Sequence, residues 1–389
     1  MSSLKILAVI GCRPNFIKIA PMMAEIKKHT EVCPFLVHTG QHYDEVMSDV
    51  FFRDLEIPQP DICLSVGSVS KPRQVARIIQ GLEDVLLDIN PDLVLVVGDV
   101  NSTLASALTA VTLGYPVAHV EAGLRSFDRE MPEEINRVLT DAIADLLFAT
   151  EGSAVENLLR EGRTPEQIFF VGNVMIDTLR MNADKIARSA ILQNLNLSPK
   201  TYAVLTLHRP SNVDDPSSLA RIAGALEELQ RHTRLVFPIH PRTAARLDCL
   251  ASWQQLSSLP NIQAVAPLGY LDFIQLMKES LFVLTDSGGV QEESTALGVP
   301  CLTLRENTER PVTITQGTNQ LVGTRKETIV AKGLEIINGG IFRGRIPEKW
   351  DGRASERIVS VLLQNAGTIK QLYGAVKKRE ICLDMLTRA

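Results

Sequence analysis

The sequence alternates short, uninterrupted apolar runs with segments of helical length, and this alternation restricts the fold more than any other feature. The N-terminal runs are Lys5–Ile10, Pro34–Thr39, Leu93–Gly98, Val117–Val120, Leu146–Ala149 and Ile168–Val171. Between them lie helical patterns at Pro14–His29, Pro72–Asp88, Ser102–Gly114 and Pro132–Ala144. Strands that are apolar on both faces and separated by helices are typical of a parallel sheet covered on both sides. The sequence therefore predicts an α/β fold.

A second series of strand-like runs follows a polar helical stretch at Asp177–Ser198. These runs are Tyr202–Leu207, Leu235–Ile239, Ile262–Val265, Leu281–Thr285 and Cys301–Leu304. A chain of 389 residues is long enough for two or three domains. We predict two Rossmann-like domains, at residues 1–178 and 179–365, followed by a C-terminal helix at residues 366–389.

The overall charge excludes some classes of partner. The chain has 40 Lys and Arg against 45 Asp and Glu, a net charge of −5, so it is not built to coat nucleic acid. No apolar run is long enough to span a membrane, and the N-terminus lacks the features of a signal peptide. The six cysteines are scattered without a CxxC pair, which favours reduced thiols and a cytoplasmic location.

Polar side chains follow the predicted strands at the points where the strands end. They are Arg13, Gln41, His42, Asp99, Glu121, His208, His240 and Asp286. Turns after strands are commonly polar, but these residues are mostly charged or histidine rather than ordinary turn formers. Ligands of open α/β sheets bind outside the carboxyl ends of the strands. The pattern therefore predicts two sheets that face each other across a ligand-binding cleft.

The segment Thr285-Asp286-Ser287-Gly288-Gly289 is the best candidate for binding phosphate, because the chain has neither a P-loop nor a GxGxxG motif after its first strand. Ser287 can cap the helix that follows, and Gly288 and Gly289 allow a ligand to approach the backbone amides. An ordinary capped helix is the alternative interpretation. Glu292 or Glu293 in the first turns could hold a ribose diol. Arg13 and Lys18 add cations near the first strand.

Several motifs together resemble those of the non-hydrolysing UDP-N-acetylglucosamine 2-epimerases, from about residue 4 to residue 365. They are Gly11-x-Arg13-Pro14-x-x-x-Lys18, Thr39-Gly40-Gln41-His42, Gly98-Asp99, His119-Val120-Glu121-Ala122-Gly123-Leu124-Arg125, Pro132-Glu133-Glu134-x-Asn136-Arg137, His208-Arg209, Thr285-Asp286-Ser287-Gly288-Gly289-x-Gln291-Glu292-Glu293 and Glu309-Arg310-Pro311. The resemblance implies a two-domain glycosyltransferase-B architecture, a C-terminal helix that crosses back onto the first domain, and a homodimer. It also implies that UDP-GlcNAc is converted to UDP-ManNAc without a metal or any other cofactor, by elimination of UDP to 2-acetamidoglucal and re-addition.

The resemblance assigns roles to single residues. The catalytic residues would be Asp99, Glu121, Glu133 and His208. The substrate-binding residues would be Arg13, Lys18, Ser287, Gly288, Gly289, Glu293 and Arg310. A regulatory or secondary site would use Gln41, His42, Arg209 and His240. Each has a structural alternative: Asp99 could cap a helix, Glu133 could offset a helix dipole, Lys18 could lie on a solvated face, and Arg310 could form a surface ion pair.

The chain departs from the family pattern after His208, where Arg209-Pro210-Ser211 replaces the Arg-Arg-Glu of many close bacterial members. Thr39–Asp44 and Leu124–Phe127 look like relatives that act on UDP-2,3-diacetamido-glucuronic acid, which is an alternative substrate for the same chemistry. Three other functions stay open: a hydrolysing epimerase, a glycosyltransferase of the same fold and a non-catalytic sensor of nucleotide sugars.

Overall fold

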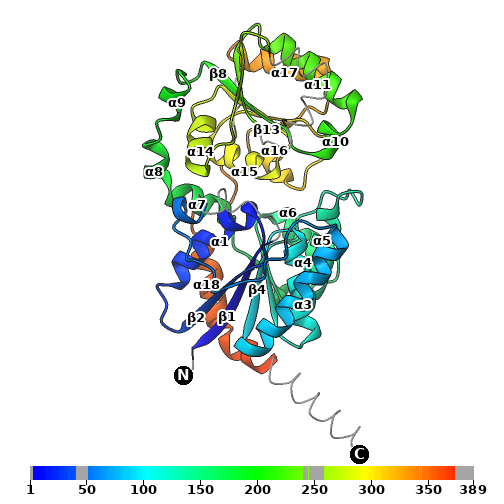
Figure 1. Cartoon of the computed structure of the whole chain (residues 1–389), viewed down its shortest axis with the longest axis vertical. Coiled ribbons are helices and arrows are strands. Elements are labelled where there is room, and N and C mark those ends of the chain that lie inside the picture. The colour runs from blue at the N-terminus through cyan, green and yellow to red at the C-terminus, as the bar shows by residue number, and fades with distance from the viewer. Residues whose placement is uncertain are drawn as a thin grey trace, which may run out of the picture. The chain divides into compact units, whose positions relative to one another are not determined.

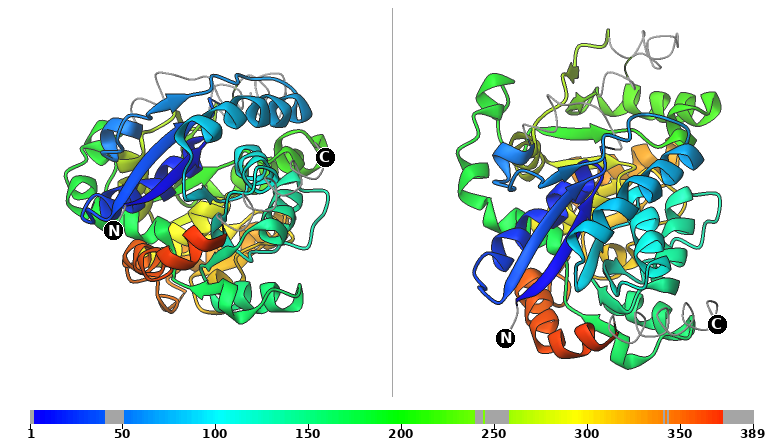
Figure 2. Two further views of the ribbon diagram at one scale, coloured as in Figure 1. Left: turned by 90° about the horizontal axis from the view of Figure 1, so that it is seen from below. Right: turned by 60° about the horizontal axis from the view of Figure 1, so that its bottom comes forward.

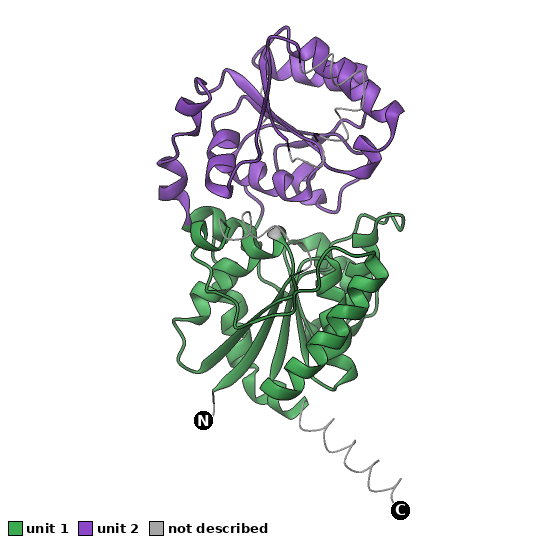
Figure 3. Cartoon of the chain, viewed as in Figure 1, with its two compact units in different colours: residues 1–181, 348–389 green, residues 182–347 purple. Residues whose placement is uncertain are grey.

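The chain forms two units, residues 1–181 with 348–389 and residues 182–347 (Figure 3). The computed structural model describes residues 3–40, 51–239, 244, 258–340, 342 and 344–372. Each described unit contains one sheet with helices packed against it, so the two units are considered in turn. Among the described residues, no helix combines the length and the apolarity needed to cross a bilayer.

Unit 1 is built on a parallel sheet with the strand order β3-β2-β1-β4-β5-β6-β7. The strands are β1 (Leu4–Ile10), β2 (Val32–His38), β3 (Ile62–Cys63), β4 (Leu93–Val97), β5 (Val117–Ala122), β6 (Leu146–Ala149) and β7 (Ile168–Phe170). The chain moves outward from β1 in one direction and from β4 in the other, which makes the carboxyl ends of β1 and β4 a topological switch point. Every residue of β4 is buried, which explains its unbroken apolar sequence.

Helices cover both faces of this sheet (Figure 1 and Figure 2). They are α1 (Arg13–Ile26), α3 (Lys71–Ile89), α4 (Asn101–Thr112), α5 (Pro132–Ile143), α6 (Gly152–Arg160), η1 (Pro165–Gln167), α7 (Val174–Met181) and α18 (Ala354–Gln364). Helices α3, α4 and α5 pack side by side on one face, and α1, α7 and α18 pack together on the other. Proline in the first turn of α1, α3 and α5 fixes where these helices begin.

Unit 2 repeats the design with the strand order β10-β9-β8-β11-β12-β13, again all parallel. Its strands are β8 (Tyr202–Thr206), β9 (Arg234–Pro238), β10 (Ile262–Val265), β11 (Phe282–Thr285), β12 (Cys301–Thr303) and β13 (Asn319–Leu321). Its helices are α8 (Ala183–Ala187), α9 (Ile191–Asn194), α10 (Pro210–Val213), α11 (Pro216–Leu229), α14 (Tyr270–Lys278), α15 (Gly288–Leu297), α16 (Pro311–Thr315) and α17 (Lys326–Ile337). The predicted α/β fold with two parallel sheets is confirmed.

The chain returns to unit 1 earlier than the sequence suggested. The first boundary falls after Met181, three residues from the predicted position, but residues 348–365 belong to unit 1 and not to the second domain. Trp350 is fully buried in unit 1 and donates from Nε1 to the Thr150 carbonyl (3.1 Å). Asp177 accepts from the amides of Ala354 and Ser355 at 3.1 and 2.6 Å, which fastens the start of α18. Of the predicted C-terminal helix, residues 373–389 lie outside the described residues.

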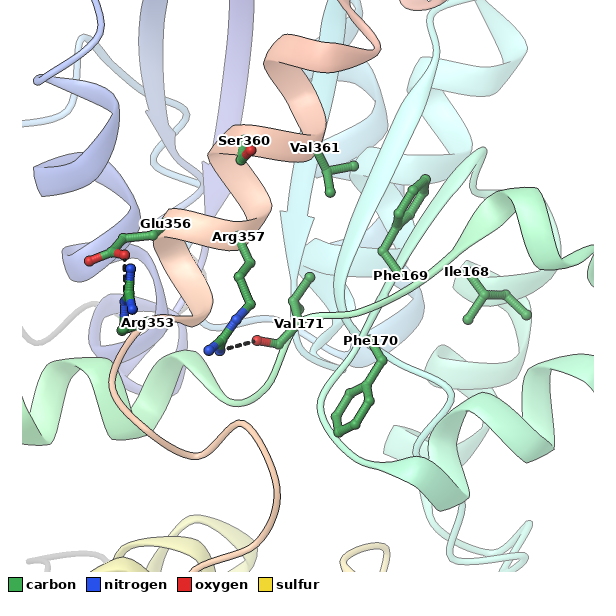
Figure 4. A pocket seen from close by; sticks show the side chains of 9 residues that line it. All are labelled: Ile168, Phe169, Phe170, Val171, Arg353, Glu356, Arg357, Ser360 and Val361. Atoms are coloured by element: carbon green, nitrogen blue, oxygen red, sulfur yellow. Dashed lines mark hydrogen bonds and ion pairs between the residues drawn. The ribbon is translucent and has the colours of Figure 1, made fainter.

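A shallow groove of about 630 Å³ lies where α18 meets the outer strand β7 (Figure 4). It is lined by Ile168, Phe169, Phe170, Val171, Arg353, Glu356, Arg357, Ser360 and Val361. Arg357 crosses it and donates from Nη1 to the Val171 carbonyl at 3.0 Å. The groove contains none of the predicted site residues, and it marks the seam along which the returning chain docks on unit 1.

Gly172 provides a test of this docking, since it has a φ of 93° and a Cβ placed on it would lie 2.1 Å from the Lys349 carbonyl oxygen. Gly172→Ala must therefore displace the returning chain as well as strain the backbone. Gly162, with a φ of 84° and no atom within 4 Å of a Cβ placed there, is the matched control. We expect Gly162→Ala to cost about 1–2 kcal/mol of unfolding free energy, the strain of a left-handed residue. Gly172→Ala should cost at least about 2 kcal/mol more in urea titrations; equal losses would contradict this docking.

Candidate active site

Asp99 lies two residues after the end of β4, at the switch point of the sheet in unit 1. Its carboxylate accepts from Arg137 Nε at 3.0 Å, and its carbonyl accepts from Asn136 Nδ2 at 2.9 Å. Helix α4 begins at Asn101, and its N-cap position is Val100, so Asp99 is not the cap of that helix. The structure thus removes the capping alternative for Asp99 and places a partly exposed carboxylate at the strand end, ion-paired to Arg137 on α5.

Glu121 lies at a break in the pairing of β5. The register between β5 and β6 shifts between Val120 and Ala122, which leaves Glu121 as the extra residue of a bulge. Its φ is 76°, in the left-handed region that residues with a Cβ rarely adopt. Bulges next to active sites re-aim a side chain, and strained backbone of this kind accumulates at functional sites. The local geometry therefore supports a specific task for the Glu121 carboxylate.

Lys18 on α1 forms a buried ion pair with Glu121, and both side chains are only 5% exposed. The structure thus excludes a solvated face as the setting of Lys18. Gly98 permits the approach, because a Cβ there would lie 2.9 Å from Lys18 Nζ. Asn15 fixes the neighbouring backbone: its Nδ2 donates to the Val97 carbonyl, and its Oδ1 accepts from the Gly11 amide. An amine and a carboxylate are thereby held at the switch point.

A fully buried network of His119, Arg125 and Asp141 lies behind these groups, and none of the three was among the predicted site residues. His119 on β5 contacts Asp141 through Nδ1 at 2.7 Å and the Gly98 carbonyl through Nε2 at 2.8 Å. Asp141 on α5 also accepts from the Gly123 amide (2.9 Å) and pairs with Arg125 (2.7 Å). Burial alone would raise the pKa of Asp141, but the charges and hydrogen bonds of His119, Arg125 and the Gly123 amide lower it. The network therefore fastens the backbone on both sides of Glu121.

The two glutamates at the start of α5 lie in different settings. Glu133 is partly buried in the first turn, which leaves both interpretations of this residue open. Glu134 is 2% exposed and accepts from the Ser126 and Phe127 amides at 2.9 Å each, while it also pairs with Arg137. Residues three positions apart on a helix lie next to each other, so the spacing of Glu134 and Arg137 in the sequence could have indicated this ion pair.

In unit 2, His208 and Asp286 form a close pair at the ends of β8 and β11. His208 Nδ1 lies 2.7 Å from Asp286 Oδ1, and the amides of His208 and Arg209 donate to the same carboxylate. Asp286 is completely buried, whereas the His208 side chain is 54% exposed. Burial by itself would raise the pKa of Asp286, but the charge and hydrogen bonds of His208 and the two amides hold it below its ordinary value.

Helix α15 starts at Gly288, directly after Asp286 and Ser287. Ser287 occupies the N-cap position, but its side chain makes no capping hydrogen bond, so the predicted hydroxyl cap is wrong. Instead, the Ser287 amide donates to Thr285 Oγ1 at 3.0 Å, which keeps this turn close to β11. The first amides of a helix have no acceptor within the helix, and together with the helix dipole they attract anions. Gly289 lies partly exposed in this first turn.

Arginines gather beside the start of α15. Glu309 pairs with Arg305 at 2.8 Å and lies 3.5 Å from Arg310 and 3.9 Å from Arg209. Arg310 is only 5% exposed and pairs with Glu292 of α15 at 2.8 Å, so it is not a surface ion-pair partner. Gly288 makes room for this group, because a Cβ there would lie 2.5 Å from Glu309 Oε1. Arg305 and Glu309 were not among the predicted site residues.

Glu293, on the same helix, is a buried acid. Burial and the neighbouring Glu292 raise its pKa to about 8, although a hydrogen bond from Tyr270 acts in the opposite direction. Glu293 is therefore largely protonated at neutral pH and can donate as well as accept, which suits the hydroxyls of a diol.

Four predicted positions cannot be placed. The Arg13 side chain, Gln41, His42 and His240 lie outside the described residues, although the backbone of Arg13 starts α1. In the described ranges, no three His, Cys, Asp or Glu side chains are grouped so as to hold a metal ion. What is described provides carboxylates and an amine on unit 1, and an anion-attracting helix start, a histidine and arginines on unit 2. Such groups can move protons and stabilise a leaving phosphate.

Comparison with known proteins identifies close relatives. The family model described as UDP-N-acetylglucosamine 2-epimerase matches residues 24–363. The UDP-N-acetylglucosamine 2-epimerase of Methanocaldococcus jannaschii is 43% identical over 92% of this chain and 99% of its own length. The crystal structure of that enzyme with UDP-GlcNAc and UDP has a TM-score of 0.87, at 42% identity, and covers 93% of this chain and 100% of its own. The UDP-2,3-diacetamido-2,3-dideoxy-D-glucuronate 2-epimerase of Pseudomonas aeruginosa is 41% identical over 92% of this chain and 99% of its own length.

The Glu293 carboxyl gives a prediction about pH. Its pKa is about 8 in the folded chain against an ordinary 4.5, so between these values the folded state holds a proton that the unfolded state has lost. Stability must then fall as the pH rises through this window, by up to about 1.4 kcal/mol per pH unit. Glu293→Gln removes this loss.

Urea denaturation of both proteins at pH 5, 6.5, 8 and 9 measures the effect. We expect the variant to gain stability relative to the parent from pH 5 to 8 and to gain no more above that. Glu327→Gln, at an exposed position on α17, is the control and should show a constant difference. A constant difference for Glu293→Gln as well would show that this carboxyl titrates normally.

Proposed function

The chain belongs to the UDP-N-acetylglucosamine 2-epimerase family, and we propose that it interconverts UDP-GlcNAc and UDP-ManNAc. The proposal is carried by the carboxylates of Asp99 and Glu121 at the ends of the adjacent strands β4 and β5, the second one held on a strained bulge beside Lys18. Inversion of a carbon centre requires a proton to be removed on one face and returned on the other, and both steps need acid–base groups.

The chemistry at carbon 2 explains why phosphate-binding groups are needed as well. Carbon 2 of the sugar is not next to a carbonyl in the ring, so a base alone would not remove its proton fast enough. We propose that the C1–O bond breaks with its electron pair leaving on UDP, that the carbon 2 proton passes to a carboxylate, and that 2-acetamidoglucal forms. Re-addition of UDP to carbon 1, with protonation of carbon 2 on the opposite face, completes the inversion.

In this proposal, different described residues carry out the acid–base steps, the stabilisation of the diphosphate and the binding of the ribose. Asp99, Glu121 and Glu133 supply the acid and the base. His208, Arg310 and the start of α15 stabilise the charge of the departing diphosphate, a role that we also keep for Arg13. Glu293 binds the ribose hydroxyls. The amine of Lys18 pairs with the Glu121 carboxylate and holds it in position.

UDP-2,3-diacetamido-glucuronate is the second candidate substrate. It is favoured by the Pseudomonas aeruginosa relative, which is nearly as similar (41% identical) as the Methanocaldococcus jannaschii enzyme (43%). Both sugars carry a 2-acetamido group and a UDP leaving group, so the same elimination serves both. A panel of UDP-sugars assayed with the purified chain separates them by relative kcat/KM.

The test of the function is incubation with UDP-GlcNAc in heavy water. We expect UDP-ManNAc to form and deuterium to enter carbon 2, both visible by NMR, because the proton that is returned comes from solvent. Asp99→Asn and Glu121→Gln should each slow turnover by about 10²-fold or more, the usual loss for an acid–base group.

Asp145→Asn is the matched control, because this carboxylate caps the opposite end of β5 by accepting from the Val117 amide at 2.9 Å. It should keep turnover close to that of the parent. Absence of both the product and the deuterium would exclude the proposed reaction, whereas full activity of the Asp99 and Glu121 variants would exclude only the roles given to them.

We further propose that the chain forms a homodimer through α4 and α5. Leu108 and Val111 on α4 and Ile135, Val138 and Leu139 on α5 are 38–46% exposed, and the two helices pack against each other. Exposed apolar side chains gathered on neighbouring helices are typical of an interface.

Leu139→Glu would place a charge in this interface and should shift the chain from dimer to monomer in analytical ultracentrifugation. Leu159→Glu, at an equally exposed leucine (45%) on α6, is the control and should leave the mass unchanged. A dimer that survives Leu139→Glu, or a parent chain that sediments as a monomer, would rule out this interface.

We also propose that the protein works in a reducing compartment such as the cytoplasm. Among the described residues, Cys12, Cys33, Cys63 and Cys301 form no disulfide, which supports the interpretation of the scattered cysteines.

A further inference from the structure

Asp286 is a deeply buried carboxylate of unit 2 that the proposed chemistry leaves without a role. It follows β11, and its side chain is 0% exposed. Strands β8 and β11 are paired in parallel with Thr206 opposite Thr285, so the residues after both strands emerge side by side. This register brings Asp286 next to the segment that carries His208.

The Asp286 carboxylate holds both the backbone and the side chain of His208. It accepts from the His208 amide at 3.0 and 3.1 Å, from the Arg209 amide at 2.9 Å and from Asn212 Nδ2 at 3.1 Å. His208 Nδ1 lies 2.7 Å from Oδ1 of the same carboxylate. A buried carboxylate accepts but cannot donate when it is ionised, so the hydrogen of Nδ1 points at Asp286.

This contact leaves Nε2 as the ring nitrogen that can meet a ligand. The His208 side chain is 54% exposed although one of its nitrogens is fixed on a buried group. A carboxylate behind an imidazole sets its tautomer and orientation and stabilises the imidazolium form. The imidazolium can then donate from Nε2 to an oxygen whose negative charge grows as a bond to it breaks.

We propose that Asp286 is a positioning residue that holds His208 with Nε2–H directed at the diphosphate of the nucleotide sugar. This role rests on the proposed function. When the C1–O bond breaks, the electron pair moves to the diphosphate oxygen, and the Nε2–H hydrogen bond strengthens as that charge develops. Asp286 thereby acts on the reaction through His208 without touching the substrate.

A double-mutant cycle tests this inference with Asp286→Asn, His208→Gln and the double variant. Asparagine is nearly isosteric and still accepts through Oδ1, but it carries no charge. We expect each single variant to lower kcat by about 10²-fold while KM changes by less than about threefold, because the stabilisation acts mainly in the transition state. In the His208→Gln background, Asp286→Asn should cause no further loss of kcat.

A merely structural role would give a different pattern. If Asp286 only anchors the loop, its substitution would lower kcat by the same factor in both backgrounds, and that result would overturn the inference. Asp215→Asn is the matched control, because Asp215 also accepts from two amides, those of Ser217 and Ser218, at the start of α11. It should lower the melting temperature without changing kcat.

Two further measurements keep the inference separate from the proposed reaction and from folding. Calorimetric titration with UDP repeats the cycle without catalysis: the losses of affinity in the two single variants should not add in the double variant. If the losses in UDP affinity are not additive but the chain does not epimerise UDP-GlcNAc, the proposed reaction is excluded and the coupling of Asp286 with His208 is kept. If the losses are additive, the coupling of Asp286 with His208 is excluded. If Asp286→Asn does not fold, Asp286→Glu, which displaces the charge, completes the same cycle with the same criteria.

Discussion

The left-handed backbone at Glu121 is the constraint on which the candidate site of unit 1 depends. A residue with a Cβ in this conformation costs roughly 1–2 kcal/mol, and the bulge also interrupts the pairing of β5 with β6. The conformation persists because its surroundings determine it from both sides. His119 holds the Gly98 carbonyl on the neighbouring strand end, and Asp141 holds the Gly123 amide just beyond the bulge. The strained backbone at Glu121 is therefore held by hydrogen bonds to the residues on both sides of it.

Unit 2 uses the same kind of interaction at the end of its strands: a buried aspartate that accepts hydrogen bonds from backbone amides. A buried aspartate in each unit accepts backbone amides from the segment that carries a polar group: Asp141 accepts from Gly123, and Asp286 accepts from His208 and Arg209. A buried carboxylate is costly unless it is hydrogen-bonded, and both aspartates have a histidine ring nitrogen at 2.7 Å in addition to these amides. Each histidine thus completes the hydrogen bonding of the carboxylate that fixes the loop. Removing the histidine would leave a buried carboxylate with one hydrogen bond fewer.

The sequence could predict the features of the fold and the site that depend on neighbouring residues, but not those that depend on contacts between distant ones. Uniform apolar runs identify buried parallel strands, and the rule that ligands bind at their carboxyl ends led directly to Asp99, Glu121 and His208. Strands β3, with two residues, and β13, with the sequence Asn-Gln-Leu, lack the apolar run that identified the equally short β7 and β12. The early return of the chain to unit 1 depends on Trp350 docking across 200 residues, which no local pattern reveals. The partners Asp141 and Arg305 were missed for the same reason, because their roles depend on how a helix or loop packs against a strand end.

The charge balance shows why a chain with a net charge of −5 can still attract a diphosphate. Beside the start of α15, the guanidinium groups of Arg209, Arg305 and Arg310 face the carboxyl groups of Glu292 and Glu309. Glu293 would add a further negative charge if it were ionised, but burial keeps its pKa at about 8 and so keeps it neutral at neutral pH. Desolvation of one acid therefore preserves a local positive potential that the overall composition does not suggest. Because this potential is short-ranged and set by a titrating group, it weakens as the pH rises through about 8, even though no cation is lost.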